Sequence, residues 1–85
     1  MQEKDIYNLF TFHSTHSALV MERVLKAEGL GIKIIPVPRV ISSSCGLAAR
    51  TFVGDIENIK TIIQAEEIEI DECYIMTDNN NIRQV

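Results

Sequence analysis

The segment Ile6-Tyr-Asn-Leu-Phe-Thr-Phe12 opens the fold, and it carries apolar side chains on both of its alternating faces. Aromatic and β-branched residues in this pattern favour a central strand, because both faces of such a strand are covered. Residues 18–28 follow with the apolar spacing of a helix. Ser14 or Thr15 is a suitable N-cap for that helix, and Gly29 ends it.

The remaining chain adds three strands and one helix to this beginning. Residues 32–37 form a predicted second strand, and residues 39–46 form a loop. Residues 47–53 favour a third strand, although the first four of them would also fit a helical turn. A second helix opens at Asp55, which is expected to cap it, and residues 68–76 supply a last strand.

The predicted order is therefore β-α-β-β-α-β. Its simplest packing is a ferredoxin-like α+β sandwich, with an antiparallel sheet and two helices on one face. We expect a single domain over residues 1–76. Residues 77–85 include Asn79-Asn-Asn81 and are predicted to be a frayed or disordered tail.

Composition limits the classes of protein that the chain can belong to. It has 85 residues, 46% of them hydrophobic and 24% charged, which excludes a disordered segment or a coiled coil. A core of this size has little stability to spare, so a homodimer that buries a sheet edge or an apolar face would fit. The net charge of -4 argues against general nucleic-acid binding.

Cysteine usage and the N-terminal residues bear on the compartment. The chain has two cysteines far apart, whereas a secreted domain of this size would usually carry several disulfides. The first five residues, Met1 to Asp5, are polar and lead into no signal-peptide core, and no apolar run is long enough to span a bilayer. These features predict a reducing, cytoplasmic location and no membrane partner.

Acidic residues are distributed unevenly along the chain. Residues 29–54 contain no acid but hold three cations, Lys33, Arg39 and Arg50. Residues 6–21 also lack acids and contain both histidines, His13 and His16. If these two stretches meet in space, they would form a locally positive site that favours anions and thiolates.

Cys45 is the most strongly marked residue for chemistry. It follows Ser42-Ser-Ser44 and precedes Gly46 in the predicted loop. Hydroxyls and backbone N–H groups in such a loop can point at one anionic atom, as in a backbone nest. Alternatively, the serines form an ordinary polar loop and Cys45 is a small buried hydrophobe. Residue types alone leave both interpretations open.

The histidines are candidates for assisting this cysteine. His13 and His16 lie at the first strand-to-helix junction, where ligand contacts are common, so one could act as a base or as an electrostatic partner of Cys45. They could equally be structural, with His13 at the strand end and His16 in the first helical turn. Zinc binding by His13, His16 and Cys45 is only weakly indicated, because paired-cysteine spacing is missing, and we expect no metal and no cofactor.

The remaining candidates are cationic or thiol side chains. Arg39 follows Pro36-Val-Pro38, which restrains its backbone and could aim the guanidinium at an anion, or leave it in solvent. Arg50 could point to the same site or to solvent. Cys73 lies in the predicted last strand and is interpreted as core or sheet-edge filler.

Three segments together resemble a known family. Phe12-His-Ser-Thr15, Ile35-Pro-Val-Pro-Arg39 and Ser42-Ser-Ser-Cys-Gly46 occur in the order and spacing of the DUF3343 family, small bacterial selenium/sulfur carrier protein-like domains. The resemblance covers roughly residues 6–76 and implies sulfur or selenium handling. The family's marked positions correspond to His13, Ser14, Pro38, Arg39, Ser44, Cys45 and Gly46.

The resemblance leads to a leading hypothesis and two alternatives. Cys45 would accept sulfur or selenium as a persulfide-type adduct and hand it to a sulfur- or selenium-handling partner protein, as a carrier rather than a stand-alone enzyme. His13 and Arg39 would stabilise the thiolate, while Ser43, Ser44 and the rest of the serine loop would shape the pocket. The alternatives are a small thiol-dependent transferase and a non-catalytic anion- or protein-binding module in which Cys45 is incidental. Carriers of the TusA type have a Cys-Pro-x-Pro segment, which is not found here.

Overall fold

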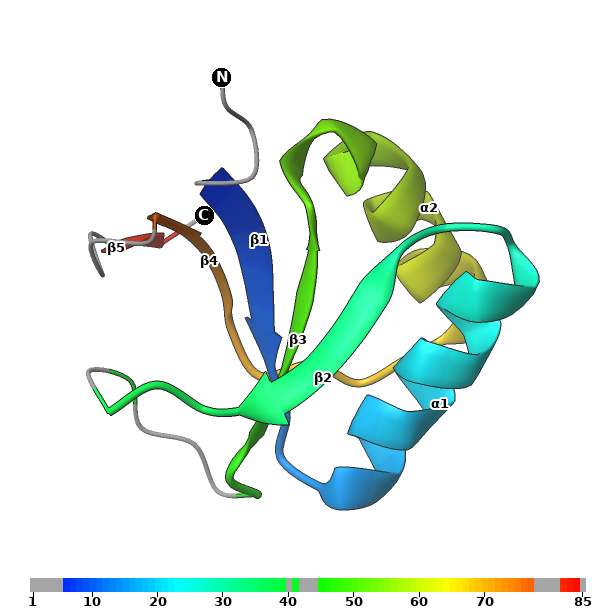
Figure 1. Ribbon diagram of the computed structural model, residues 1–85. Helices are drawn as coiled ribbons and strands as arrows, with labels where there is room; N and C mark the ends of the chain where they lie inside the picture. The colour runs from blue at the N-terminus through cyan, green and yellow to red at the C-terminus, as the bar shows by residue number, and fades with distance from the viewer. Residues whose placement is uncertain (1–5, 40, 42–44, 78–81, 85) are drawn as a thin grey trace.

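The computed structural model describes residues 6–39, 41, 45–77 and 82–84. They form an antiparallel five-stranded sheet in the order β2-β3-β1-β4-β5, with two α-helices beside it (Figure 1). The first four strands and the helices follow the order β-α-β-β-α-β, so the predicted ferredoxin-like α+β fold is confirmed. The elements in chain order are β1 (Ile6–Thr11), α1 (Thr15–Ala27), β2 (Ile32–Pro36), β3 (Leu47–Phe52), the short 3-10 helix η2 (Val53–Asp55), α2 (Ile56–Glu66), β4 (Cys73–Thr77) and β5 (Ile82–Gln84).

β1 is the central strand that its sequence predicts. It pairs antiparallel with β3 on one side and with β4 on the other. Every residue of β1 after Ile6 is buried, since one face of the strand lies under the helices and the other under a second apolar cluster. The strand ends at Thr11, and the chain then turns into α1.

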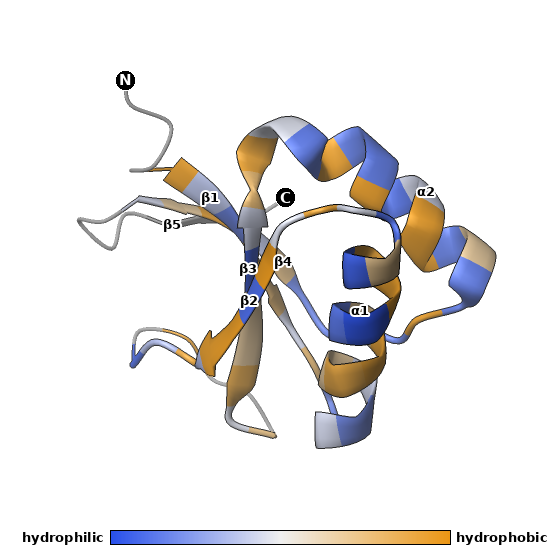
Figure 2. Ribbon diagram, turned by 45° about the vertical axis from the view of Figure 1, so that its right-hand side comes forward, coloured by the Kyte–Doolittle hydropathy of each residue, from blue (hydrophilic) through white to orange (hydrophobic). Residues whose placement is uncertain are grey.

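The main core lies between the sheet and the two helices, which Figures 1 and 2 show on the same side of the sheet. Fully burying one large apolar side chain contributes about 1.5–3 kcal/mol, so this cluster supplies most of the driving force for folding. Its buried members are Phe10, Phe12, Ala18, Met21, Leu25, Ala49, Ile59 and Ile68. Both helices mix hydrophobic and hydrophilic residues along their length, as helices do that cover a sheet on one side only (Figure 2).

α1 begins and ends where the predicted caps place it, and its first turn precedes the apolar pattern of residues 18–28. Ser14 is its N-cap, and the Ser14 Oγ atom accepts a hydrogen bond from the Ser17 backbone N–H at 3.2 Å. This bond satisfies one of the free N–H groups of the first turn, which allows the helix to start at Thr15. Gly29 follows the C-terminus with φ 79°, a left-handed conformation that glycine adopts without steric cost.

The second half of the fold departs from the predicted boundaries at two points. Residues 47–52 are a strand and not a helical turn, but Val53 already belongs to η2. Asp55 is the N-cap residue of α2, as predicted, but its side chain makes no capping hydrogen bond. The tight turn of η2 gives Asp55 φ and ψ values of -96° and 7°, whereas a capping side chain usually needs extended backbone.

The last predicted strand is shorter than expected, and its first part is a connection. β4 starts at Cys73, while Ile68 and Ile70 lie in the segment between α2 and β4. Both isoleucines still contribute to the core under the helices. The alternating apolar pattern of residues 68–70 therefore indicated buried side chains. Local sequence alone does not show whether such side chains belong to a paired strand or to a connection.

The expected tail also needs correction where the structure describes it. Thr77 ends β4, and Ile82–Gln84 form β5, which pairs antiparallel with β4. Asparagine-rich segments favour turns between strands as well as frayed ends, so Asn79-Asn-Asn81 did not decide between the two.

Glu67 is the one described residue other than glycine with a positive φ, at 54°. A left-handed conformation costs a residue with a Cβ about 1–2 kcal/mol, while glycine adds about 0.4–1 kcal/mol of unfolded-state entropy. We therefore expect Glu67→Gly to raise the free energy of unfolding by about 0.5–1 kcal/mol in urea titrations. Glu66→Gly, inside α2, is the matched control and should lower it. Equal effects of the two substitutions would contradict this account.

Candidate functional site

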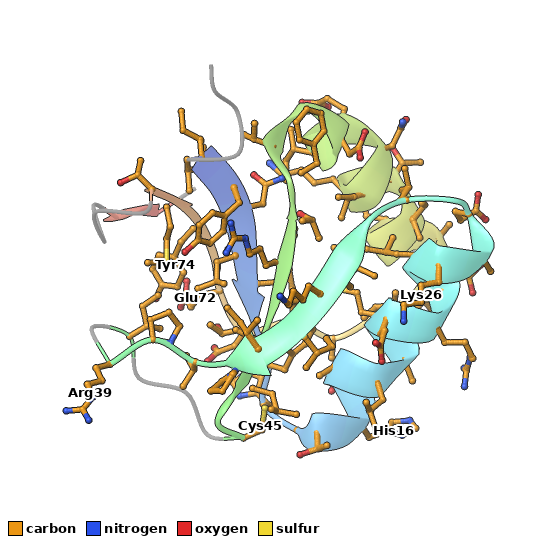
Figure 3. The ribbon with its side chains drawn as sticks, viewed as in Figure 1. His16, Lys26, Arg39, Cys45, Glu72 and Tyr74 are labelled. Atoms are coloured by element: carbon orange, nitrogen blue, oxygen red, sulfur yellow. The ribbon has the colours of Figure 1, made fainter. Side chains whose placement is uncertain are left out.

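Cys45 lies immediately before β3, at the end of the sheet where β1 also ends (Figures 1 and 3). Its side chain is partly buried and packs against the core under the helices. The Leu47 backbone N–H donates a hydrogen bond to Cys45 Sγ at 3.4 Å, and the thiol lies 3.6 Å from the Leu47 carbonyl oxygen, which can accept its proton. The sulfur therefore has a fixed donor that would stabilise negative charge on it.

Gly46 makes this geometry possible. Its φ of 78° is left-handed, and the resulting turn brings the Leu47 N–H back toward the preceding sulfur. The Gly46 carbonyl oxygen accepts a hydrogen bond from the Val37 N–H at 2.9 Å, directly beyond the pairing of Pro36 with Leu47. The β2–β3 ladder thus holds the base of the loop that carries Cys45.

The serine loop lies mostly outside the described residues. Ser43 and Ser44, two of the predicted binding residues, belong to that part, so their direction relative to Cys45 remains a prediction. Ile41 is described, and it is buried with Leu9, Ala48 and Met76 on the sheet face away from the helices. The loop is therefore tied down at Ile41 and again at Gly46.

His13 lies at the same end of the sheet as Cys45, because Thr11 pairs with Ala48. Its Nε2 atom is 3.3 Å from Asp71 Oδ1, and its side chain is 62% exposed. The Asp71 N–H donates to the Thr11 carbonyl at 2.7 Å, which fixes the carboxylate next to the end of β1. The predicted acid-free site thus has an acid at its border, contributed by a segment far away in the sequence.

Ser14 has a structural role beside His13. Its Oγ atom caps α1 and also donates a hydrogen bond to Ser17 Oγ at 3.3 Å. The residue therefore sets where α1 begins relative to the end of the sheet that carries Cys45.

Neither arginine side chain is directed at Cys45. Arg39 is exposed, and Figure 3 shows its guanidinium pointing away from the molecule, well separated from Cys45. Arg50 lies over the Tyr7 ring, 4.0 Å from its centroid, on the face of the sheet opposite the helices. Arg39 therefore leaves the sheet at the same end as Cys45 with its side chain directed outward, and Arg50 belongs to another surface.

Sequence reasoning missed two groups at this end of the sheet. The Leu47 N–H is a backbone donor, and no residue type signals it. Asp71 could have been suspected only if the last strand had been placed beside β1, which brings residues 71 and 72 to Thr11.

Among the described residues, no group of three metal-ligating side chains is present, and His16 is exposed at the start of α1, apart from Cys45 (Figure 3). No described helix is long and apolar enough to cross a membrane.

Cys73 differs from Cys45 in its surroundings. It begins β4 and packs against the core under the helices. Burial raises the pKa of the Cys73 thiol, and the positive charge of Lys60 offsets part of this rise. At neutral pH, Cys73 therefore exists as a thiolate less often than an ordinary cysteine does.

We expect iodoacetamide at neutral pH to alkylate Cys45 several-fold faster than Cys73, because only the thiolate reacts and Cys73 is shielded. The difference between the two alkylation rates should become smaller as pH rises, because the pH then approaches the raised pKa of Cys73 and more of its thiol is ionised. Peptide mapping by mass spectrometry measures both rates, and urea-unfolded protein, in which the two thiols should react alike, is the control. Faster alkylation of Cys73 in the folded protein would show that Cys45 is the more protected thiol.

These features define a class: a small ferredoxin-like domain with one loop thiol held by a backbone N–H at the end of its sheet. A family model described as "Putative Se/S carrier protein-like" matches residues 7–75, and the chain belongs to this family. No curated protein and no solved structure matches the chain.

Proposed function

We propose that the domain is a sulfur or selenium carrier, with Cys45 as the atom-accepting residue. The observation that carries the proposal is the hydrogen bond from the Leu47 N–H to Cys45 Sγ at 3.4 Å, in a turn that Gly46 makes possible. A donor fixed before the reaction stabilises a sulfur anion without further rearrangement. Membership in a selenium/sulfur carrier-like family supports the same role.

The loading step is a transfer between sulfur atoms. The Cys45 thiolate attacks the outer sulfur of a donor persulfide, R–S–SH. A Cys45–sulfur bond forms, the donor's S–S bond breaks, and the donor leaves as the thiolate R–S⁻. Cys45 now carries a persulfide, and no net oxidation or reduction has occurred. A thiolate of the partner protein then attacks the outer sulfur, and Cys45 leaves as a thiolate.

The surrounding residues have separate parts in this proposal. His13, held by Asp71 at the same end of the sheet, is the candidate to exchange protons with an incoming donor or acceptor. Ser43 and Ser44 would contribute donors to the persulfide. Arg39, exposed on the far side of the loop, would contact the partner protein rather than the thiol. A reducing, cytoplasmic compartment would keep Cys45 available between cycles.

The test is loading with glutathione persulfide, followed by mass spectrometry of the intact protein. We expect the mass to increase by one sulfur atom in the wild type and in Cys73→Ser, and to stay unchanged in Cys45→Ser. Mixing the loaded protein with a small acceptor thiol should return the original mass. Loading at Cys73, or none at all, would refute the carrier role. Sustained turnover of donor and acceptor would instead favour a thiol-dependent transferase.

A further inference from the structure

One edge of the sheet ends in a strand that is paired on one side only. β2 is the last strand at this edge, and it bonds to β3. Figures 1 and 2 show α1 alongside β2, and the two elements pack against each other. Among the described residues, β2 has no strand on its outer side. Such an edge presents backbone N–H and C=O groups that can pair with another chain.

The ladder between β2 and β3 shows which backbone groups point outward. The Val37 N–H donates to the Gly46 carbonyl at 2.9 Å, just beyond the end of β2. In an antiparallel pair, only alternate residues bond to the neighbouring strand. Counting back from Val37, the residues whose backbone groups point away from β3 are Ile32, Ile34 and Pro36. The outer edge therefore offers three carbonyl acceptors, but only the first two of these residues have an N–H to donate.

From this pattern we propose that β2 pairs antiparallel with β2 of a second copy of the chain, with Ile34 of both copies at the two-fold axis. This register forms about four backbone hydrogen bonds, between the two Ile34 residues and from each Ile32 N–H to the partner's Pro36 carbonyl. A shift by one residue places Lys33 directly opposite the partner's Lys33, and like charges in that position destabilise a sheet. The opposite shift requires N–H groups that Pro36 lacks. Lys33 and Pro36 thus select this register.

The same axis brings the two α1 helices together. α1 packs on both β2 and β3, so the helix axis lies roughly above the space between these strands. Because paired strands lie about 4.8 Å apart, the two helix axes are then roughly 10 Å apart, which is the usual spacing of packed helices. Ile34 is the middle residue of β2, so it lies level with the part of α1 about one turn before the helix ends. This part runs from Glu22 to Lys26.

The charged side of this part of α1 faces the second copy. Val20 lines a hollow with Glu66 at the end of α2, so the opposite side of α1, where Glu22 lies, is directed toward the β2 edge. Glu22 and Lys26 form an i,i+4 ion pair at 3.1 Å. Two helices related by a two-fold axis run antiparallel, so Glu22 of each copy faces the partner's Lys26. The charges of the two helices are therefore complementary across the axis.

Apolar side chains flank the same contact. Leu19 lies one turn before Glu22 on the same side of α1, and it is 51% exposed. Ile32 and Ile34 are only half-buried, although both pack against the core under the helices. The second copy covers these side chains, and a small domain gains stability by burying them.

The dimer leaves the proposed carrier chemistry accessible. Cys45 lies in the loop that follows β2, and antiparallel pairing places the two thiols at opposite ends of the shared edge. Each thiol therefore remains available to its own donor and acceptor. The dimer does not depend on Cys45, so it is expected to survive Cys45→Ser, and its absence would leave the carrier role unaffected.

Sedimentation equilibrium of the full chain measures the association. Over protein concentrations from about 1 μM to 1 mM, we expect a monomer–dimer equilibrium with a dissociation constant in the micromolar range. Glu22→Lys and Lys26→Glu each turn attraction across the axis into repulsion, and each should raise the dissociation constant about tenfold. The matched controls are Glu57→Lys and Lys60→Glu, at exposed positions of α2, which should associate as the wild type does.

Mixing the two α1 variants tests whether the helices face each other. An equimolar mixture of Glu22→Lys and Lys26→Glu should form heterodimers about as tightly as the wild type associates, because opposite charges again meet across the axis. A wild type that stays monomeric over the whole concentration range would overturn the proposal. So would folded Glu22→Lys and Lys26→Glu that associate as tightly as the α2 controls.

Backbone hydrogen exchange followed by nuclear magnetic resonance tests the strand pairing itself. The amides of Ile32 and Ile34 should exchange about tenfold more slowly in concentrated protein than in dilute protein, because only the dimer protects them. The amides of Lys33 and Ile35 bond to β3 and should be protected at both concentrations. A dimer in which the Ile32 and Ile34 amides still exchange freely would use another surface and would refute the pairing.

Discussion

Asn8→Asp is expected to lower the free energy of unfolding by at least about 3 kcal/mol at neutral pH, because it creates an unpaired buried charge. Asn8 is fully buried, and its Nδ2 atom donates to Thr51 Oγ1 at 3.2 Å and to the Phe52 carbonyl at 3.1 Å. An ionised aspartate has no proton to donate to that carbonyl. Among the described residues, Asn8 Oδ1 has no hydrogen-bond partner, so the new carboxylate could accept at most the proton of the Thr51 hydroxyl, which does not balance a buried charge.

The stability lost in Asn8→Asp should increase as pH rises. Burial disfavours the charged form, so the pKa of the new carboxyl in the folded state lies above the unfolded value of about 3.9. Below about 3.9 both states are protonated and the electrostatic penalty is absent. As pH rises above that value, the unfolded state ionises first, and stability falls until the folded-state pKa is passed. Urea unfolding of mutant and wild type across this range measures the difference.

Asn8→Leu is the matched control for the charge. It has similar size and removes both the hydrogen-bond donor and the unpaired Oδ1 atom. Its cost should be smaller, about 1–3 kcal/mol, and independent of pH, because only Thr51 Oγ1 and the Phe52 carbonyl lose a partner. A loss in Asn8→Asp that does not vary with pH would mean that water reaches this position.

Gly46→Val should have the second largest effect. We expect it to lower the free energy of unfolding by about 2 kcal/mol and to slow the sulfur loading of Cys45. A β-branched residue strongly disfavours the left-handed φ of 78° at this position. Relaxing the turn moves the Leu47 N–H away from the Cys45 sulfur, which it now approaches to 3.4 Å. Denaturant titration measures the first effect, and mass spectrometry after glutathione persulfide treatment measures the second.

Two further variants test whether Gly46→Val acts through the positive φ at this position or through steric clash of the added side chain. A Cβ added at Gly31 meets no atom within 4 Å, as at Gly46, but φ at Gly31 is not positive. Gly31→Val should therefore cost much less than Gly46→Val. Gly46→Asn should retain most of the loading, because asparagine tolerates the left-handed region. Normal loading in folded Gly46→Val would show that the turn does not assist Cys45.

The candidate site could be predicted in part. Cys45 and Gly46 were singled out because a cysteine between serines and a glycine is an unusual local pattern. The direction of Arg39 could not be predicted, because a loop side chain is oriented by tertiary contacts and solvent. The pairing of His13 with Asp71 was equally hidden, since the two residues meet only after β4 has paired with β1.

The sequence by itself determined the order of the elements and the ends of α1. Apolar periodicity and capping are local, so the pattern of residues 6–12, the Ser14 cap and the left-handed Gly29 have the same meaning in any fold. The thiol's place in a loop before β3 followed from the same kind of information. Each of these features depends on residues within a few positions of one another.

Tertiary structure alone decided which surfaces form. It paired β5 with β4, packed Ile68 and Ile70 against the core without making them a strand, and set Arg50 over Tyr7 instead of beside Cys45. It also brought Lys33 opposite Arg50. These contacts join residues far apart in the sequence, and their free energy depends on burial and charge that exist only after the chain has folded.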